Sequence, residues 1–275
     1  MTATEAIARQ QALPETVRRV RLRKALTGTV RFLISLAVLI GIWWVFAVVR
    51  NVPLLMPSPP EVMHAFGTLL GSGALVEDTL ASLGRILSGL AIGAVGGVLL
   101  GLLLGSSRIV RGLLTPLVTL FRFVPPLAWY APVLAWLGTG EESKIVLIVY
   151  TSIFVVAINT LSGMGETPVN ARRMLRMSGS SWAQRFFLLD LPHALPYAIT
   201  GIRIALGNAF MTVVTAEMLG SKVGLGALIT NGMTTLSLPK VFVAILVLGV
   251  LGLIADRLFV WATNRFLRRF LPWTR

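Results

Sequence analysis

The chain has 275 residues, of which 55% are hydrophobic and only 13% are charged, about half the charged share of a typical soluble domain. So few charges suffice only where most of the surface faces lipid, which excludes an ordinary soluble domain. The net charge is +14, from 25 Lys and Arg against 11 Asp and Glu, and the absence of cysteine excludes disulfides and thiolate metal sites.

Apolar segments occur in chain order at a length that suits a membrane. A helix needs about 20 apolar residues to cross a hydrocarbon core about 30 Å thick. The sequence therefore predicts an all-α integral membrane protein with about six transmembrane helices. The first span is expected to be a retained anchor, because residues 1–31 are polar and no small-residue cleavage site follows that span. The predicted spans are residues 32–49, 86–104, 113–137, 145–161, 194–219 and 241–263.

Lys and Arg are concentrated in alternate connections, which predicts the orientation of the spans. We place the N-terminus inside, so that residues 1–31 and the tail 264–275 are basic cytoplasmic segments. Arg122 and Arg203 lie within predicted helices. This positive-inside pattern explains the net charge better than nucleic-acid binding does, so no nucleic-acid partner is expected. The basic residues left on the outside are Arg50, Arg85, Lys144, Lys222 and Lys240.

Two segments outside the spans have a recognisable character. Residues 14–27 mix basic and apolar positions, and they either lie along the anionic inner leaflet, where membrane lipid is the partner, or form a solvated tail. Residues 51–84 are the longest external connection. This connection opens with several prolines, so it begins extended or as turns. A short surface helix is predicted over about residues 60–70.

The second predicted span has a glycine at every fourth position. This spacing keeps the glycines on one face of the helix, and small residues on one face let two backbones approach closely in lipid. The face is either a tightly packed seam or a surface that slides during a transport cycle. We favour packing, which does not exclude sliding. The glycines are Gly89, Gly93, Gly97, Gly101 and Gly105.

The third predicted span is interrupted by Pro125 and Pro126, which remove two backbone donors and bend or unwind the helix. The carbonyl groups freed in this way are tolerated at membrane depth only where protein or a water-filled cavity covers them. The broken helix, with Trp129 just after it, therefore indicates a translocation pathway. Arg122 either attracts an anionic solute, or extends to the inner headgroups, or precedes a helix that starts later in the chain.

The fifth predicted span contains Arg203 and Glu217, nearly four helical turns apart, which places both on one face at opposite depths. Charges inside a membrane usually face a bundle interior or a cavity. The pair is either a polar lining or gate of a pathway, or a structural pairing near the membrane boundaries. The candidate pathway residues are Arg122, Pro125, Pro126, Trp129, Arg203, Asn208, Met211 and Glu217.

The loop of residues 163–193, between the fourth and fifth spans, is basic and amphipathic, and it is long enough for a helix or helix pair outside the membrane. Gly179 is expected to break or cap that helix, and Pro192 is expected to end it. A cytoplasmic helix of this kind is either an interfacial helix or a docking element for a soluble partner.

The segment Gly179-Ser-Ser-Trp-Ala-Gln-Arg-Phe-Phe-Leu-Leu-Asp-Leu-Pro192 resembles the coupling loop of ABC importer permeases, in which a Glu-Ala-Ala triplet precedes a Gly and a later Leu-Pro. Further stretches resemble the taurine, aliphatic sulfonate and nitrate branch of that family. They run in family order over most of the chain beyond the N-terminal tail. These stretches are Met56-Pro-Ser-Pro-Pro-Glu-Val62, Arg122-Phe-Val-Pro-Pro-Leu-Ala-Trp129, Leu137-Gly-Thr-Gly-Glu-Glu-Ser-Lys-Ile145, Thr200-Gly-Ile-Arg-Ile-Ala-Leu-Gly207 and Ala216-Glu-Met-Leu219.

The resemblance implies a type I ABC importer permease fold with a cytoplasmic coupling helix, in which residues 32–263 form the transmembrane permease domain. The family's Glu-Ala-Ala falls here on Arg173-Met174-Leu175, so a basic residue replaces the acidic one. The ATPase-coupling residues implied are Arg173, Arg176, Gly179, Ser180, Ser181, Trp182, Arg185, Phe186, Asp190 and Pro192.

The resemblance also implies the partners. A second copy of the chain completes the pathway as a homodimer, two cytoplasmic ATP-binding subunits hold ATP and Mg, and an extracytoplasmic binding protein delivers substrate. The sequence agrees in lacking a phosphate-binding loop. With His64 and His193 as the only histidines, a metal site or other cofactor within the chain is not expected, nor is any catalytic residue.

The substrate implied is a small anion such as taurine or another sulfonate, nitrate or bicarbonate. One rival is a secondary transporter or channel that works without ATP, which predicts paired titratable residues near the midplane or an inverted repeat. Another is a membrane-embedded lipid enzyme, which needs a nucleophile with a base or a metal cluster. The sequence displays none of these features.

Overall fold

The computed structural model describes residues 30–31, 34–35, 37–49 and 56–266. The chain forms two units, one up to Met63 and one from His64 onward. The first unit contains an apolar helix over Ala37–Val49, which covers part of the first predicted span. Its Trp43 Nε1 donates to the carbonyl oxygen of Pro57 at 3.1 Å. The rest of that span, the basic stretch 14–27 and the end of the C-terminal tail lie outside the described residues.

The helix predicted over residues 60–70 is confirmed as α3 (Pro59–Gly71). Its two prolines lie in the first turn, where a missing N–H costs little, and the Ser58 N–H donates to Glu61 Oε2 at 2.7 Å. The next helix, α4 (Ala74–Ser106), begins well before the start at residue 86 that hydropathy predicted. The connection before α4 is therefore shorter than predicted, because Asp78 and Ser82 near the start of the helix bond to Gly224 and Glu217.

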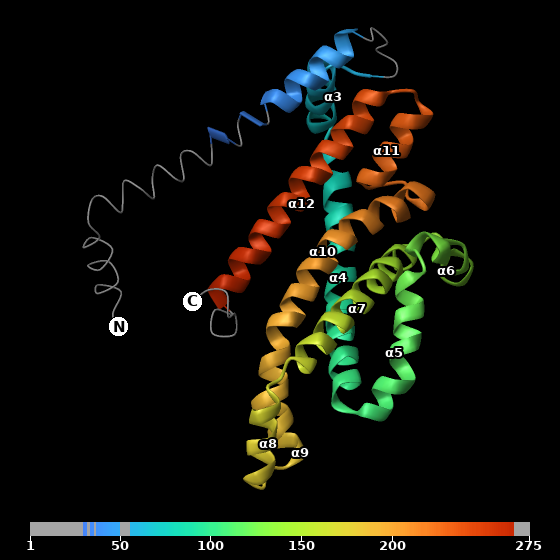
Figure 1. Cartoon of the computed structure of the whole chain (residues 1–275). Coiled ribbons are helices and arrows are strands. Elements are labelled where there is room, and N and C mark those ends of the chain that lie inside the picture. Colours follow the sequence, from blue (N-terminus) through green and yellow to red (C-terminus); the bar gives the residue numbers. More distant parts are fainter. Residues whose placement is uncertain (1–29, 32–33, 36, 50–55, 267–275) are drawn as a thin grey trace, which may run out of the picture. The chain divides into compact units, whose positions relative to one another are not determined.

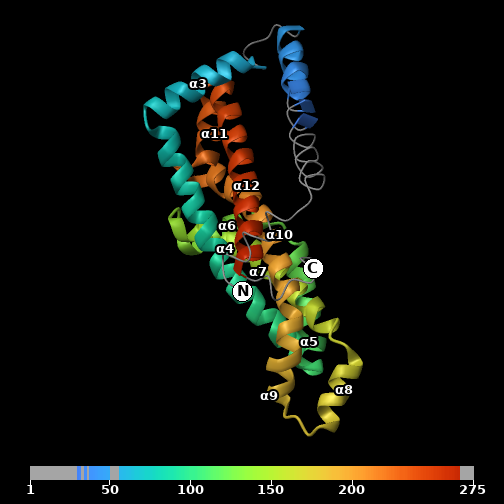
Figure 2. The ribbon, with the colours of Figure 1, turned by 90° about the vertical axis from the view of Figure 1, so that its left-hand side faces the viewer.

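The second unit is a bundle of helices (Figure 1). In the part of the chain that the structure describes there is no strand, which agrees with the all-α prediction. Helix α7 has its most extensive contacts with α4 and α10, while α8 and α9 project at one end (Figure 2). After α4 come α5 (Arg108–Phe123), the 3-10 turn η1 (Pro126–Trp129), α6 (Tyr130–Leu137), α7 (Glu141–Gly165), α8 (Val169–Met177), α9 (Trp182–Arg185), the π turn η2 (Phe186–Asp190), α10 (Leu191–Gly220), α11 (Leu225–Thr234) and α12 (Leu238–Phe266).

The glycine face of α4 packs directly against α7. A Cβ atom at Gly93 would lie 2.5 Å from Ser152 Cβ, and one at Gly97 would lie 2.6 Å from Val156 Cβ, so nothing larger than glycine fits without a shift. The α7 side chains recur at the same interval of four, which lets the two rows interdigitate. The predicted packing is thus confirmed. The α7 residues that meet the glycines include Ile148, Ser152, Val156, Thr160 and Met164.

Helix α7 also packs on α10 by the same principle. A Cβ atom at Gly201 of α10 would lie 2.8 Å from Asn159 Cβ. Small and β-branched side chains of α10, including Ala205, Ala209 and Val213, are fully buried against Val156 of α7 and its neighbours. The helices α4, α7 and α10 therefore form the rigid core that positions everything else.

Within the described residues, four helical segments are long and apolar enough to cross a membrane, and a fifth crossing results if a bent pair counts as one span. Four of the predicted spans fall in α4, α7, α10 and α12. The third predicted span is the bent pair, with 91° between Arg108–Phe123 and Pro126–Leu137. The short helix α11 was not predicted, and Leu225 and several neighbours within it are buried.

Candidate functional site

The break between α5 and η1 has a direct cause in the sequence. Pro125 and Pro126 carry no N–H, so the helical ladder ends at Phe123. The carbonyl groups exposed by the break find a donor on α7, because the Tyr150 hydroxyl lies 2.5 Å from the Phe121 oxygen and 3.2 Å from the Val124 oxygen. Covering these groups is a requirement for non-helical backbone at membrane depth.

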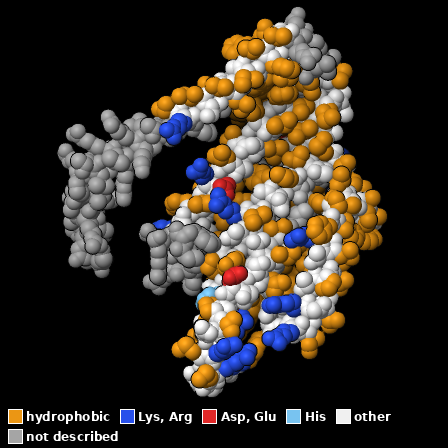
Figure 3. All heavy atoms as spheres, in the orientation of Figure 1, with side chains coloured by type: hydrophobic (Ala, Val, Ile, Leu, Met, Phe, Trp, Pro, Cys, Tyr) orange, Lys and Arg blue, Asp and Glu red, His pale blue; other side chains and the backbone are white. Residues whose placement is uncertain are grey.

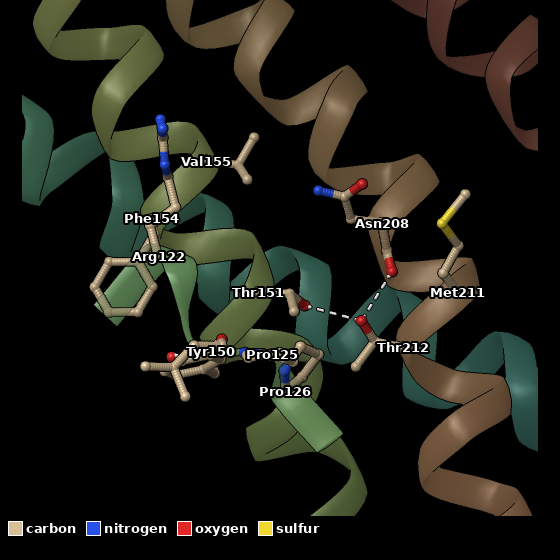
Figure 4. Close-up of a pocket in the computed structure, with 11 residues that line it drawn as sticks. Arg122, Pro125, Pro126, Tyr150, Thr151, Phe154, Val155, Asn208, Met211 and Thr212 are labelled. Atoms are coloured by element: carbon tan, nitrogen blue, oxygen red, sulfur yellow. Dashed lines mark hydrogen bonds between the residues drawn. The ribbon is translucent and has the colours of Figure 1, made fainter. Parts of the chain in front are cut away.

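A cavity of about 280 Å³ lies beside the break (Figure 4). Helix α7 contributes Thr151 to its wall and α10 contributes Asn208 and Thr212, and these side chains face one another in Figure 4. Thr212 Oγ1 donates to the Asn208 carbonyl at 2.9 Å and lies 3.3 Å from Thr151 Oγ1. Apolar walls with a few polar groups are typical of ligand pockets. The lining residues are Arg122, Val124, Pro125, Pro126, Tyr150, Thr151, Phe154, Val155, Asn208, Met211 and Thr212.

Arg122 brings a positive charge to this cavity. It lies in the last turn of α5, and its guanidinium carbon is 5.0 Å from the ring centroid of Phe123. Among the described residues no carboxylate lies within 4 Å of it. A guanidinium without a carboxylate partner retains its full capacity to bind an anion.

Trp129 lies behind the cavity rather than in its wall. Its ring centroid is 5.9 Å from that of Tyr150 and 6.2 Å from that of Phe121. Phe154 joins the same cluster, 5.1 Å from Tyr150. This aromatic cluster holds the two sides of the break together, so Trp129 supports the position of Arg122 without contacting the cavity.

The predicted pathway residues fall into two groups. The cavity brings together Arg122, Pro125, Pro126, Asn208 and Met211. Arg203 and Glu217, which the sequence placed on one face, do not line this cavity, and each is paired with a different partner.

Arg203 is paired on the side of α10 that faces α12. Its Nε and Nη2 lie 2.6 and 2.9 Å from the two carboxylate oxygens of Asp256, and both side chains are partly exposed. The pair borders a separate groove of about 600 Å³ between α10 and α12. The positive charge of Arg203 is therefore already neutralised by a carboxylate.

Glu217 is buried at the other end of α10, with 1% of its surface exposed. Its Oε1 accepts from Arg85 Nη1 at 2.7 Å and from Ser82 Oγ at 2.8 Å, and its Oε2 accepts from the Gly226 N–H at 2.8 Å. Arg85 also binds Glu141 at the start of α7 through two nitrogens, at 2.5 and 2.8 Å. Glu217 and Arg85 together thus join α4, α7, α10 and α11.

The segment between α10 and α11 closes over this ion cluster. The Gly224 N–H donates to Asp78 Oδ1 at 2.7 Å, and the backbone of Gly224 has a φ of 133°, which side chains rarely adopt. A Cβ atom there would also lie 2.5 Å from Glu217 Cδ. Such a fully bonded arrangement is what structural pairing requires.

The loop predicted to couple to an ATPase forms a hairpin of α8 and α9. Gly179 has a φ of 77°, and the N–H groups of Ser180 and Gly179 donate to the carbonyls of Leu175 and Arg176, which is a Schellman motif. Ser181 then caps α9 through a reciprocal pair of bonds with Gln184. The sequence expectation that Gly179 ends the first helix is confirmed.

Pro192 does not end a helix, contrary to the sequence expectation. Helix runs without interruption over Trp182–Gly220, because the π turn η2 precedes Pro192 and the Leu191 N–H donates to the Phe186 carbonyl one position further back than usual. This register shift accommodates the missing N–H of proline. The coupling hairpin is therefore continuous with α10, whose side chains line the cavity.

The arginines of the hairpin divide into internal and outward groups. Arg172 Nη2 lies 2.7 Å from Asp190 Oδ1, and Arg185 donates to the Ser180 carbonyl, so both hold the hairpin together. Arg173 and Arg176 are exposed and have no ion pair within the described part of the chain. Figure 3 shows Lys and Arg side chains gathered at this end of the molecule.

Apolar side chains are exposed on the same hairpin. Met177 is 87% exposed and Trp182 is 57% exposed, with the Trp182 ring stacked on Phe186 at 5.4 Å between centroids. A rigid knob with apolar side chains and a basic rim has the composition of a protein-docking surface.

Sequence reasoning missed several residues that the structure brings to these sites. In the sequence, Tyr150 and Thr151 look like any polar residues within an apolar span. Their role becomes visible only because α7 packs beside the break. Arg85 was placed in an external connection, although it lies within α4 and is buried. Across the described segments no group of three or more His, Cys, Asp or Glu is placed to hold a metal.

Long apolar helices, a covered helix break and a projecting amphipathic hairpin define a multi-pass helical membrane protein. Residues 97–268 match the family described as binding-protein-dependent transport system inner membrane component, and the chain belongs to this family. The family predicted from the coupling loop is thereby confirmed.

Two curated relatives support this assignment, and one solved structure has the same fold. The chain is 35% identical to the taurine transport system permease protein of Escherichia coli over 87% of this chain and 88% of that protein. It is 34% identical to the nitrate import permease protein of Synechocystis over 83% and 86%. Its fold matches a chain of the inward-facing methionine ABC transporter with a TM-score of 0.59 and 22% identity, covering 72% and 96%. The fold is thus that of a type I ABC importer permease.

Proposed function

We propose that this chain imports a small anion, such as taurine, another sulfonate, nitrate or bicarbonate, through a pathway that includes the cavity beside the α5 break. The observation that carries the proposal is Arg122, a cation in the cavity wall that has no carboxylate partner among the described residues. Relatives that carry taurine and nitrate in their names support the choice of an anion. Asn208 and the threonine hydroxyls add hydrogen-bonding groups for its oxygens.

The same proposal includes the partners. Two copies of the chain enclose the pathway, two cytoplasmic subunits bind ATP and Mg and hydrolyse the ATP, and an extracytoplasmic protein delivers the anion. Both termini lie in the cytoplasm, which places the hairpin of α8 and α9 on the side of the ATPases. The ion cluster around Glu217 then lies at the outer end, where the binding protein docks.

The hairpin transmits the ATPase cycle to the cavity in this scheme. Met177 and Trp182 supply apolar contact area, and Arg173 and Arg176 supply charge. Because the hairpin continues into α10 as one helix, a displacement of the knob moves Asn208 and Met211 relative to α7. This continuity supports alternation of the cavity between the two sides of the membrane.

Transport measurements on the assembled importer test the proposal. Arg122→Gln should reduce ATP-dependent uptake of labelled taurine or nitrate by about tenfold or more, since a bond to a charged group is worth about 1.5–3 kcal/mol. Arg122→Lys keeps the charge and should retain part of the uptake. Uptake by Arg122→Gln at the wild-type rate, with the complex equally abundant, would remove the cavity from the pathway.

A further inference from the structure

One side of α5 carries a stripe of polar residues that the cavity does not explain. At 100° per residue they lie within an arc of about 80° around the helix. From Arg111 to Arg122 the stripe runs about 16 Å along the axis, which is half the thickness of a hydrocarbon core. The stripe consists of Arg108, Arg111, Thr115, Thr119 and Arg122.

The other sides of α5 have the environments expected of a membrane helix. Val118 is buried against the bundle. Leu113, Leu117 and Leu120 are 68%, 49% and 61% exposed on the far side, as suits contact with lipid. A polar stripe beside such a surface is unfavourable in hydrocarbon, so it faces protein or water.

A groove of about 680 Å³ lies along the stripe, between α5 and the cytoplasmic half of α7. Arg111, Thr115 and Thr119 line it from α5, and Ser162 lines it from α7. The Thr115 hydroxyl oxygen is buried and has no hydrogen-bond partner in the described structure. Thr119 in this groove is one helical turn from Arg122, which lines the cavity at the break.

The charge of this groove is positive. Arg111 donates through Nε to the Leu104 carbonyl at 3.3 Å, which fixes its side chain without neutralising it. On the described parts of α5 and α7 the acidic residues are Glu141 and Glu142 at the opposite end, and Glu166 follows one position after Gly165. Hydroxyl groups and guanidinium groups together are donors that suit the oxygens of a small anion.

We propose that the stripe from Arg111 to Arg122 lines the inner half of the anion pathway as a water-filled exit from the cavity to the cytoplasm. This inference rests on the proposed anion import. The hydroxyls of Thr115, Thr119 and Ser162 replace part of the water shell of the anion, and the guanidinium groups at the two ends of the stripe attract it. A second copy of the chain closes the groove from the open side.

Cysteine labelling tests this exit path, because the natural chain contains no cysteine. Thr115→Cys, Thr119→Cys and Ser162→Cys are made singly, with Leu117→Cys and Leu120→Cys as matched controls on the lipid side of α5. Each variant is assembled with its ATPases in inside-out vesicles. Labelling of the permease is followed with an anionic ethylsulfonate and a cationic trimethylammonium methanethiosulfonate reagent.

The groove positions should react about tenfold faster with the anionic reagent than with the cationic one, because a positively lined cleft concentrates anions. Leu117→Cys and Leu120→Cys should react slowly with both. Adding Arg111→Gln to Thr115→Cys should abolish the preference. The proposal is overturned if the groove positions react as slowly as the leucine positions, or without charge preference in the presence of Arg111.

The labelling contrast does not depend on transport. A failure of the anion importer itself appears as uptake that Arg122→Gln leaves unchanged, whereas a failure of the exit path appears as unreactive cysteines at Thr115, Thr119 and Ser162. Ser162 lies on α7, so it reports on the groove even if a substitution in α5 prevents assembly.

Discussion

Arg85 and Arg122 both lie in apolar helices, but their surroundings differ. Arg85 is 5% exposed and donates to two carboxylates and a backbone carbonyl. Arg122 borders a cavity and has no carboxylate within 4 Å in the described structure. A charge that is buried and fully paired holds helices together, whereas a charge left without its counterion is available to a solute. The partner of an intramembrane charge, more than its depth, indicates its role.

The largest effect is expected from Glu217→Ala in the paired region. The substitution leaves Arg85 buried with one carboxylate fewer, and breaking a buried pair from one side costs about 3–5 kcal/mol. We expect a large drop in the thermal stability and in the yield of the complex, measured by fluorescence-detected size-exclusion chromatography. Glu77→Ala, which removes an exposed carboxylate of the same helix as Arg85, should change neither.

This variant also separates the two roles that the sequence left open for Glu217. If the amount of assembled complex falls as much as uptake does, Glu217 serves structural pairing. Complex of normal stability and yield that no longer transports would indicate that Glu217 acts as a gate, and it would contradict the comparison drawn from Arg85.

The glycine seam of α4 belongs to the same tightly packed region. Gly97→Ala places a methyl group 2.6 Å from Val156 Cβ and 2.7 Å from the Ile153 carbonyl oxygen, and overpacking of this kind costs about 1–3 kcal/mol. Its matched control is Gly84→Ala in the same helix, where no atom lies within 4 Å of the new methyl group. The unfolding temperature in detergent should fall for Gly97→Ala and stay unchanged for Gly84→Ala. Equal unfolding temperatures of the two variants would mean that α4 and α7 shift apart to accept the methyl group.

Tyr150 connects the packed core with the open cavity. Tyr150→Phe removes the hydroxyl that covers the Phe121 and Val124 carbonyls, at a cost of about 1 kcal/mol for a lost hydrogen bond. We expect a small loss of stability and an increase in the KM of uptake, because Arg122 is positioned by the same break. Tyr197→Phe is the control, since the Tyr197 hydroxyl bonds to none of the described residues. If Tyr150→Phe leaves the KM of uptake unchanged, the geometry of the break does not affect substrate binding.

The sequence predicted the features that depend on local pattern. Length and hydropathy predicted the spans that became α4, α7, α10 and α12, the interval of four predicted the packed glycine face, and two adjacent prolines predicted the break. Each of these follows from the geometry of one helix. The coupling hairpin was predicted by resemblance, and Gly179 took the backbone conformation expected of a helix end.

Long-range pairing was beyond local pattern. Ser82 and Arg85 lie on α4, 135 and 132 residues before Glu217, so their contact with Glu217 could be found only from the three-dimensional arrangement. Hydropathy began α4 too late because it treats Arg85 as an unpaired charge. Pro192 was predicted to end a helix because a proline cannot donate the hydrogen bond that an α-helix needs at its position. The π turn before Pro192 changes the hydrogen-bond register, so the helix continues.

The smallest effect is expected at Arg173, where the resemblance to coupling loops predicted an acidic residue and the chain has a basic one. Its exposed side chain lies on the rim of the hairpin, and a rim charge mainly changes association rate and salt dependence. If the partner ATPase has an acidic surface complementary to Arg173 and Arg176, Arg173→Glu weakens assembly and substrate-stimulated ATP hydrolysis by a few fold at low salt, with the difference vanishing at high salt. Lys222→Glu makes the same charge change at the opposite end of the bundle and should leave both measurements unaltered. Stronger assembly of Arg173→Glu would instead mean that the partner surface is basic and that Arg173 limits coupling in the natural chain.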